Sequence, residues 1–183
     1  MTDAKLSWTI YESPIGPLTL LAGPSGLRGL SFPGRGGPPA EAEEGAMPAV
    51  TDQLDAYFAG ELQDFELELD LGGTPLQQAV WRELVEIPFG TTASYGEVAA
   101  RVDESLYRSD VEPYQRARAV GSANGRNPVA IIVPCHRVIG ADGSLTGYGG
   151  GLQRKQALLD LEQGVVSGLG PDPTWASRQT SLL

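Results

Sequence analysis

The opening segment of the chain, residues 7–32, alternates apolar and polar side chains, which is the pattern of β-strands with one buried face. Gly, Pro and Ser divide this pattern into short runs, and a turn-like Ser-Pro-Ile-Gly sequence separates the first two. The predicted strands are residues 7–11, 17–21 and 26–32. These runs predict an N-terminal sheet.

The segment that follows predicts one helix and one further strand. Residues 33–48 are rich in Gly, Pro, Ala and Glu, so we expect an exposed, flexible loop there. Residues 50–58 carry apolar side chains at helical spacing, and Gly60 ends that helix. Residues 65–71 alternate Phe or Leu with Glu or Asp, which predicts a half-buried strand.

Helical periodicity dominates the second half of the chain. A Gly-Gly pair at residues 72–73 is the expected hinge, and Thr74 caps a helix directly after it. Ser94 and Glu97 have the spacing of a capping box for a second, short helix, and a third is predicted at residues 114–124. The last two suggest a helix-turn-helix, although every helical bundle contains such pairs.

A short apolar run leads to the only cysteine of the chain. Three of the four residues 130–133 are β-branched, so we expect a buried strand or extended segment that carries Cys135 into the interior. Residues 140–151 contain six glycines, which predicts a loop. Residues 152–162 form the last predicted helix.

The expected fold class is α/β in the broad sense (α+β). A small sheet-plus-helix domain at residues 1–72 precedes a mainly helical domain at residues 73–163 with a winged-helix-like helix-turn-helix. Residues 164–183 lack periodicity, and we expect a loose tail.

Composition excludes several classes of protein. No apolar run approaches the ~20 residues that span a bilayer, and the N-terminus lacks the apolar core of a secretion signal. We therefore expect a cytoplasmic protein without membrane partners, and a monomer.

The chain has one Cys and one His, Cys135 and His136, so it cannot form an intrachain disulfide or a four-ligand Cys/His zinc site. No metal site is expected.

The net charge of −10 argues at first against nucleic-acid binding. The charge is uneven, however, because residues 1–76 hold 3 basic and 12 acidic side chains. Residues 116–155 hold 6 basic side chains against Asp142 alone, a net of +5. The sequence therefore predicts a local basic surface in the second half.

Cys135 has neighbours that favour reactivity. A lone Cys after an apolar segment is more often an inert buried residue. His136 and Arg137, however, offer positive charge and hydrogen bonds that favour the thiolate. A thiol with a pKa of ~8.5 gains at most ~30-fold from complete ionisation at pH 7, so positioning and leaving-group protonation must supply the rest.

The sequence around this residue resembles a known family. Pro134-Cys-His-Arg-Val is the active-site signature of the O6-alkylguanine-DNA alkyltransferases, also called methylated-DNA–protein-cysteine methyltransferases. Segments of this family also resemble Arg118-Ala-Val-Gly, Asn127-Pro-Val-Ala-Ile-Ile-Val and Gly147-Tyr-Gly-Gly-Gly-Leu, in the same order. The resemblance is strong over residues 74–163 and looser over residues 6–72.

The resemblance implies irreversible transfer of an alkyl group from O6-alkylguanine in DNA to Cys135, with O4-alkylthymine as a further candidate substrate. His136, through a water, and Glu162 would draw the proton from sulfur. Tyr95 matches the tyrosine that protonates the departing guanine, and Asn127 the asparagine that orders the turn around the active site. The thioether product is stable, so one molecule repairs one lesion without a cofactor.

The resemblance also implies a DNA-binding surface and a base pocket. Arg118 matches the arginine that enters the DNA stack where the damaged base has left. Small residues would let the same helix approach the DNA backbone. The further DNA-binding candidates are Ala119, Ser122, Ala123 and Arg126. Val138, Tyr148 and Gly149 match residues that line the pocket for the base.

One segment departs from the family pattern, and three other functions stay open. Residues 103–115 are about nine residues longer than the family pattern and carry four acidic side chains, which we interpret as an exposed loop insertion. Its Tyr107, Arg108 and Tyr114 could also contact DNA or a protein. The alternatives are a lesion sensor that does not repair, an alkylation- or redox-responsive DNA-binding regulator, and a Cys hydrolase.

Overall fold

A four-stranded sheet forms the N-terminal half of the computed structural model, which describes residues 5–34, 37–108 and 110–168. The strands are β1 Ser7–Ser13, β2 Gly16–Gly23, β3 Gly26–Ser31 and β4 Glu43–Glu44, in the order β3-β2-β1-β4. The first three are antiparallel neighbours, and the predicted strands are confirmed. The β1–β2 turn requires Gly16, whose φ of 103° suits glycine.

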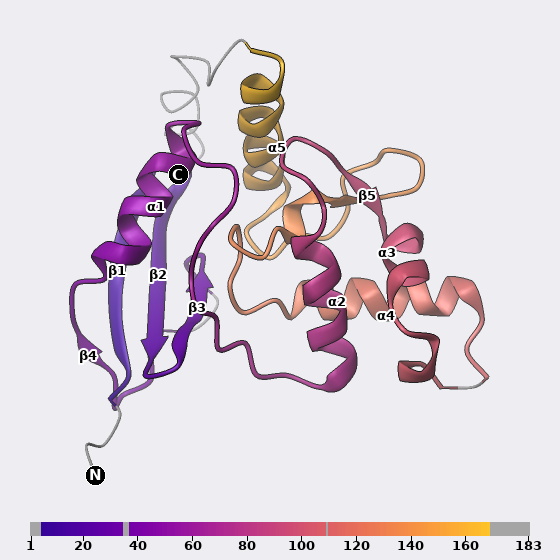
Figure 1. Cartoon of the computed structure of the whole chain (residues 1–183), viewed down its shortest axis with the longest axis horizontal. Helices are drawn as coiled ribbons and strands as arrows, with labels where there is room; N and C mark the ends of the chain where they lie inside the picture. Colours follow the sequence, from indigo (N-terminus) through magenta and orange to yellow (C-terminus); the bar gives the residue numbers. More distant parts are fainter. Residues whose placement is uncertain (1–4, 35–36, 109, 169–183) are drawn as a thin grey trace.

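Helix α1, Pro48–Phe58, lies along this sheet (Figure 1). Its buried side chains are Val50, Leu54, Tyr57 and Phe58, at the predicted helical spacing. The Tyr11 hydroxyl of β1 donates a hydrogen bond to Asp55 Oδ1 at 2.6 Å, and the Tyr11 ring stacks on Phe58. The predicted sheet-plus-helix arrangement is therefore confirmed.

Two predictions in this half need correction. The segment expected to be only a loop contains β4, which pairs in parallel with β1 at Ser7 and Glu43. Residues 65–71 alternate in burial as expected, but they do not form a strand. They are extended and make a single parallel bridge between Leu69 and Leu27. An alternating sequence determines which side chains are buried. A strand also needs backbone hydrogen bonds to a neighbouring strand along its length, and that neighbour is not specified by the alternation.

The C-terminal half is built from four α-helices, none of which, over the described residues, is long and apolar enough to cross a bilayer. They are α2 Pro75–Val85, α3 Tyr95–Arg101, α4 Pro113–Gly125 and α5 Leu152–Val166. Thr74 and Ser94 cap α2 and α3 with complete capping boxes, as predicted. The consecutive helices α3 and α4 pack together beside α2 (Figure 1), and the fold class is confirmed. Helix α5 continues past the predicted start of the tail, and residues 169–183 lie outside the described part.

The apolar run before Cys135 is a buried turn, so the predicted strand is wrong. The Val133 N–H donates to the Val129 carbonyl at 3.0 Å, which closes the turn. Ile131 has a φ of 71°, an uncommon conformation for a β-branched residue that costs of order 1–3 kcal/mol. The turn leads into the 3-10 helix η2, Cys135–Arg137. Burial was predicted correctly, but not the backbone conformation.

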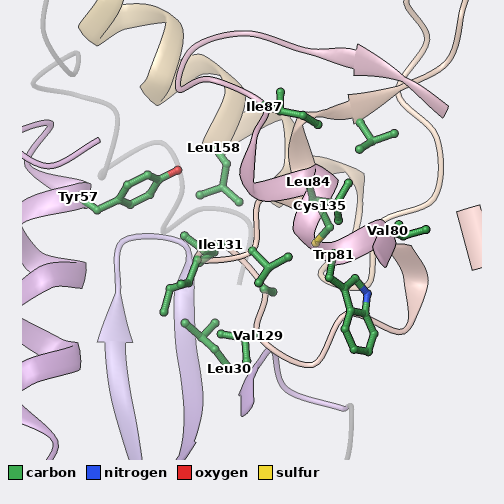
Figure 2. Packing of buried hydrophobic residues seen from close by; sticks show 14 of the residues in the cluster. Leu30, Tyr57, Val80, Trp81, Leu84, Ile87, Val129, Ile131, Cys135 and Leu158 are labelled. Carbon is green, nitrogen blue, oxygen red and sulfur yellow. The ribbon is translucent and has the colours of Figure 1, made fainter. Parts of the chain in front are cut away.

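Both halves contribute to one apolar core. Leu30 of β3 bridges Val129, with hydrogen bonds from the Leu30 N–H to the Pro128 carbonyl at 2.9 Å and from the Ala130 N–H to the Leu30 carbonyl at 3.1 Å. Figure 2 shows Leu30 and Val129 next to each other in this core. The sheet is therefore fixed directly to the turn that precedes Cys135.

Candidate active site

Cys135 begins η2 and is buried, with 5% of its surface exposed. It belongs to the apolar cluster that also contains Leu84 and Trp81 of α2 (Figure 2). Its N–H donates to the Val133 carbonyl at 2.7 Å, and its carbonyl accepts a hydrogen bond from Asn124 Nδ2 at 3.4 Å. The backbone that carries the sulfur is therefore held on both sides.

Asn127 holds the turn that delivers Cys135. Its Nδ2 donates to the Val133 carbonyl at 2.8 Å, and its Oδ1 accepts from the Val129 N–H at 3.0 Å. One buried amide side chain thus occupies two main-chain groups that a strand would have paired with a neighbour. This explains why a β-branched sequence folds here as a turn.

His136 and Glu162 form a buried pair. The distance between His136 Nε2 and Glu162 Oε1 is 2.8 Å, and both side chains are fully buried. His136 Nδ1 has no hydrogen-bond partner among the described residues. Because the carboxylate only accepts, Nε2 carries the proton and Nδ1 is left as the basic atom.

Three further groups donate to Glu162. Tyr57 OH lies 2.9 Å from Oε1, and the Gly90 N–H and Arg137 Nε each lie 3.0 Å from Oε2. Arg137 also donates to the Ile87 carbonyl at 2.6 Å. The hydrogen-bond partners of the carboxylate therefore come from α1, from the loop after α2 and from η2, and together they fix its orientation.

This network sets the charges of the pair. Burial raises the pKa of Glu162, but contacts with His136 and Arg137 outweigh it and lower that pKa from 4.5 to about 2. Burial lowers the pKa of His136 below its usual 6.5, against the raising effect of Glu162. Burial and the Glu162 charge raise the pKa of Tyr57 well above its usual range. At neutral pH, Glu162 is charged, His136 is neutral and Tyr57 remains a donor.

The free energy of unfolding should fall in acid for two reasons. The unfolded chain protonates its histidine near pH 6.5 while buried His136 resists, so stability declines below that pH. Native Glu162 holds its charge to about pH 2, so its contribution is complete above 4.5 and is lost from there downward. The Glu162 contribution is about 3 kcal/mol. Urea denaturation at a series of pH values measures both, and a constant free energy from neutral pH to about pH 3 would contradict the charge assignment.

The predicted basic surface is smaller than the sequence suggested. Lys155 is fully buried and donates to the Val138 carbonyl at 2.5 Å and the Thr146 carbonyl at 2.8 Å. Burial lowers its pKa to about 8, against the raising effect of nearby Cys135. Arg137 is buried too. These cations act inside the site, where Lys155 favours a negative sulfur.

A narrow cavity of about 20 Å³ opens beside Cys135, enough for a water but not for a purine. Its lining residues come from both halves: Leu30, Ser31, Phe32, Asn124, Asn127, Ala130, Cys135, Tyr148, Gly149 and Gly150. The structure thus brings Tyr148 and Gly149 to the sulfur. Val138 is buried behind the site, where its carbonyl binds Lys155.

Tyr95 lies at the start of α3, where β5, Ala93–Ser94, pairs in parallel with β6, Val138–Ile139. This pairing brings the α3 N-terminus next to the chain that follows η2. Tyr95 OH lies 3.3 Å from Thr146 Oγ1, on the loop that leads to the cavity. The cavity lining of the described residues does not include Tyr95 itself.

Helix α4 carries the DNA-binding candidates on two sides. Arg118 and Ser122 are exposed, as is Arg126 just beyond the helix, and Ala119 is half-buried. Arg118 lies over the exposed Tyr114 ring at 5.7 Å. Ala123 is the exception, because it is 2% exposed and its carbonyl accepts a hydrogen bond from Trp81 Nε1 at 2.9 Å. Ala123 therefore faces α2 rather than the open surface.

Most described residues of the inserted segment are exposed, as expected, but Tyr107 is buried against α3. The segment contains the 3-10 helix η1, Glu104–Leu106, and Tyr107 is 7% exposed with its hydroxyl donating to the Ala99 carbonyl at 3.3 Å. Arg116 of α4 pairs with Glu104 and lies over the Tyr107 ring at 5.4 Å. The insertion is thus anchored to both α3 and α4.

Several residues of the site carried no signal in the sequence. Tyr57 has the spacing of an ordinary core residue, and Lys155 looks like a surface cation. Asn124, a buried amide at the end of α4, was not singled out, and its polarity beside the buried Val120 and Ala123 is the only signal that could have found it. Within residues 5–34, 37–108 and 110–168, no three His, Cys, Asp or Glu side chains could together hold a metal ion.

Two family models cover most of the chain. Residues 75–164 match the DNA binding domain of 6-O-methylguanine DNA methyltransferase, and residues 6–71 match its ribonuclease-like domain. The chain belongs to the 6-O-methylguanine DNA methyltransferase family. The resemblance found in the sequence is therefore confirmed.

Relatives in this 6-O-methylguanine DNA methyltransferase family are similar over most of their length. The methylated-DNA--protein-cysteine methyltransferase of Mycobacterium tuberculosis is 53% identical over 162 residues, which is 86% of this chain and 93% of that protein. Its Mycobacterium leprae counterpart is 53% identical over 156 residues, covering 83% and 89%. A crystal structure of Mycobacterium tuberculosis OGT in complex with DNA has a TM-score of 0.78 and 47% identity, covering 93% of this chain and 99% of that one.

Proposed function

We propose that this protein repairs DNA by moving a methyl or other alkyl group from O6 of guanine to the sulfur of Cys135. One observation carries the proposal. The only Cys of the chain lines a cavity, directly next to a neutral His136 whose ring is fixed by Glu162. Relatives about half identical in sequence bear the name of this activity, and one was solved with DNA.

The proposed step is a displacement at the alkyl carbon. His136 Nδ1 takes the proton of the Cys135 thiol, through a water, and the Glu162 charge stabilises the imidazolium that forms. The sulfur attacks the carbon from behind, the bond between carbon and O6 breaks, and its electron pair stays on guanine. The Tyr95 hydroxyl then protonates the guanine. The thioether resists hydrolysis, so each molecule reacts once.

The proposed DNA contact uses α3 and α4 as the helix-turn-helix. A base inside duplex DNA must rotate out to reach Cys135, which costs a few kcal/mol. Arg118 is exposed on α4, and the family resemblance assigns it the role of filling the gap. Because the cavity holds only a water, the loop that bears Tyr148 and Gly149 must move to admit the base. The same proposal includes a monomer in the cytoplasm, with domains at residues 1–72 and 73–163.

Arg118→Ala should separate base rotation from chemistry. We expect a rate on duplex O6-methylguanine lower by roughly tenfold or more, because the gap in the stack loses its filler. The rate on the free base, which needs no rotation, should be unchanged. Arg82→Ala, an exposed charge on α2, is the matched control. An equal loss on both substrates would show that Arg118 acts elsewhere.

The function is tested with a duplex oligonucleotide that contains O6-methylguanine. After incubation, peptide mass spectrometry should find one methyl group per chain, on Cys135. Transfer that continues beyond one per chain would indicate a turnover enzyme instead. Binding of the lesion without transfer would favour the lesion sensor or the regulator, and release of a hydrolysed product the Cys hydrolase.

A further inference from the structure

Phe32, directly after β3, brings the N-terminal half to the cavity beside Cys135. It is 2% exposed and belongs to the cavity lining together with Cys135, Tyr148 and Gly150. Nothing in the chemistry described above requires an aromatic ring at this position. Its presence in the wall of a cavity of about 20 Å³ therefore concerns what the cavity can hold.

The Phe32 ring is packed tightly against the glycine-rich loop. It meets the Tyr148 ring edge-on, with centroids 5.7 Å apart and an interplanar angle of 66°. A Cβ atom built on Gly150 would lie 2.6 Å from Phe32 Cε2, so only a glycine lets the loop lie this close to the ring. The Phe32 ring is therefore in direct contact with the loop.

A cation on α5 holds the other side of the ring. Arg154 lies over the Phe32 ring at 5.3 Å from its centroid. The same guanidinium donates from Nε to the Ile15 carbonyl at 2.8 Å and from Nη1 to the Gly150 carbonyl at 3.0 Å. The hydrogen bond to Ile15 lies outside the glycine-rich loop, so it can hold the guanidinium over the ring when that loop moves.

Phe32 is also fixed relative to the sulfur. Two residues earlier in β3, Leu30 exchanges backbone hydrogen bonds with Pro128 and Ala130, in the turn that delivers Cys135. When the loop with Tyr148 moves to admit a base, β3 keeps this attachment. The wall made by Phe32 therefore stays in place while the wall made by the loop opens.

We propose that Phe32 is a specificity-determining residue that limits the size of the alkyl group that Cys135 can accept. The inference rests on the proposed function, because the alkyl carbon must then lie against the sulfur inside this cavity. A methyl group adds little volume, whereas a benzyl group must place a ring where Phe32 already lies. The excluded group is thus rejected by a steric clash rather than by weaker attraction.

The test compares two lesions in the same duplex, O6-methylguanine and O6-benzylguanine, so that DNA binding is common to both. For each protein, the ratio of the benzyl to the methyl transfer rate is measured. Phe32→Leu should raise this ratio by about tenfold or more, the scale of steric discrimination in apolar pockets, and Phe32→Ala should raise it further. The leucine variant keeps most of the buried volume, so it remains informative if the alanine variant does not fold.

Phe58→Leu is the matched control, since Phe58 is a buried phenylalanine of the same half that does not line the cavity. Its ratio should equal that of the wild type. Equal ratios in the wild type and both Phe32 variants would overturn the inference while leaving the proposed function intact, and so would an equal rise in the Phe58 variant. A wild type that transfers neither group would instead overturn the proposed function.

Discussion

Replacing Glu162 by Gln is expected to slow methyl transfer to Cys135 by roughly two to four orders of magnitude, the usual contribution of acid–base catalysis. The amide has no charge with which to stabilise the imidazolium of His136. It also replaces one of two accepting oxygens by an N–H2 group, although Oε1 now accepts a hydrogen bond from Tyr57 and Oε2 one from Arg137. The histidine would then lose both its orientation and its basicity.

The same substitution should lower the free energy of unfolding by about 3 kcal/mol or more, because it leaves a buried guanidinium without its counter-charge. Arg137 keeps its hydrogen bond to the Ile87 carbonyl, but that contact carries no charge. Single-turnover kinetics and urea denaturation measure the two effects. Glu61→Gln, the same change at an exposed position, should alter neither. A fully active Glu162→Gln variant would remove Glu162 from the mechanism.

Cys135→Ser should abolish alkyl transfer while preserving binding to lesion DNA. The substitution changes one atom, but a hydroxyl is a far weaker acid than a thiol, and the neutral hydroxyl is a much poorer nucleophile toward an alkyl carbon. The cavity wall and the backbone hydrogen bonds of Cys135 do not depend on sulfur, so the fold and the pocket remain. Transfer should fall below detection, at least four orders of magnitude under the wild type by the scale of activated nucleophiles.

Peptide mass spectrometry and a binding titration with the same O6-methylguanine duplex check this prediction. A variant that neither reacts nor binds would mean that the sulfur is needed for the structure rather than for the chemistry. Methyl transfer to another residue would mean that the acceptor has been misidentified. The serine variant also provides a stable complex in which the opened cavity can be observed.

The reactive pair was visible in the sequence because Cys135 and His136 are neighbours and are the only residues of their kinds. The rest of the site was not. Glu162 lies 26 residues from His136, and Tyr57 lies 105 residues from Glu162. Helical spacing shows that Tyr57 is buried, but it does not reveal which partner its hydroxyl meets. Such contacts come from tertiary packing, and Glu162 was identified only through the family resemblance.

The same reasoning explains the errors in backbone conformation. The β-branched residues 130–133 favour a strand on propensity, and they are indeed buried. The side chain of Asn127 provides main-chain hydrogen bonds that make a turn the better solution. Arg137 and Lys155 were counted as surface charges because charge alone says nothing of burial. Buried cations become predictable only when their carboxylate or carbonyl partners are known.

The hydrogen bond from Tyr57 to Glu162 bears on how this protein could exchange parts with its relatives. A chimera that received residues 1–72 from a distant homologue would keep its acceptor sulfur, yet it would inherit a foreign donor to the relay carboxylate. An exchange of segments at Gly72-Gly73 would thus change a hydrogen-bond donor to Glu162 although every residue after the exchange point stays the same. Substitutions in the two halves are therefore expected to have been selected jointly.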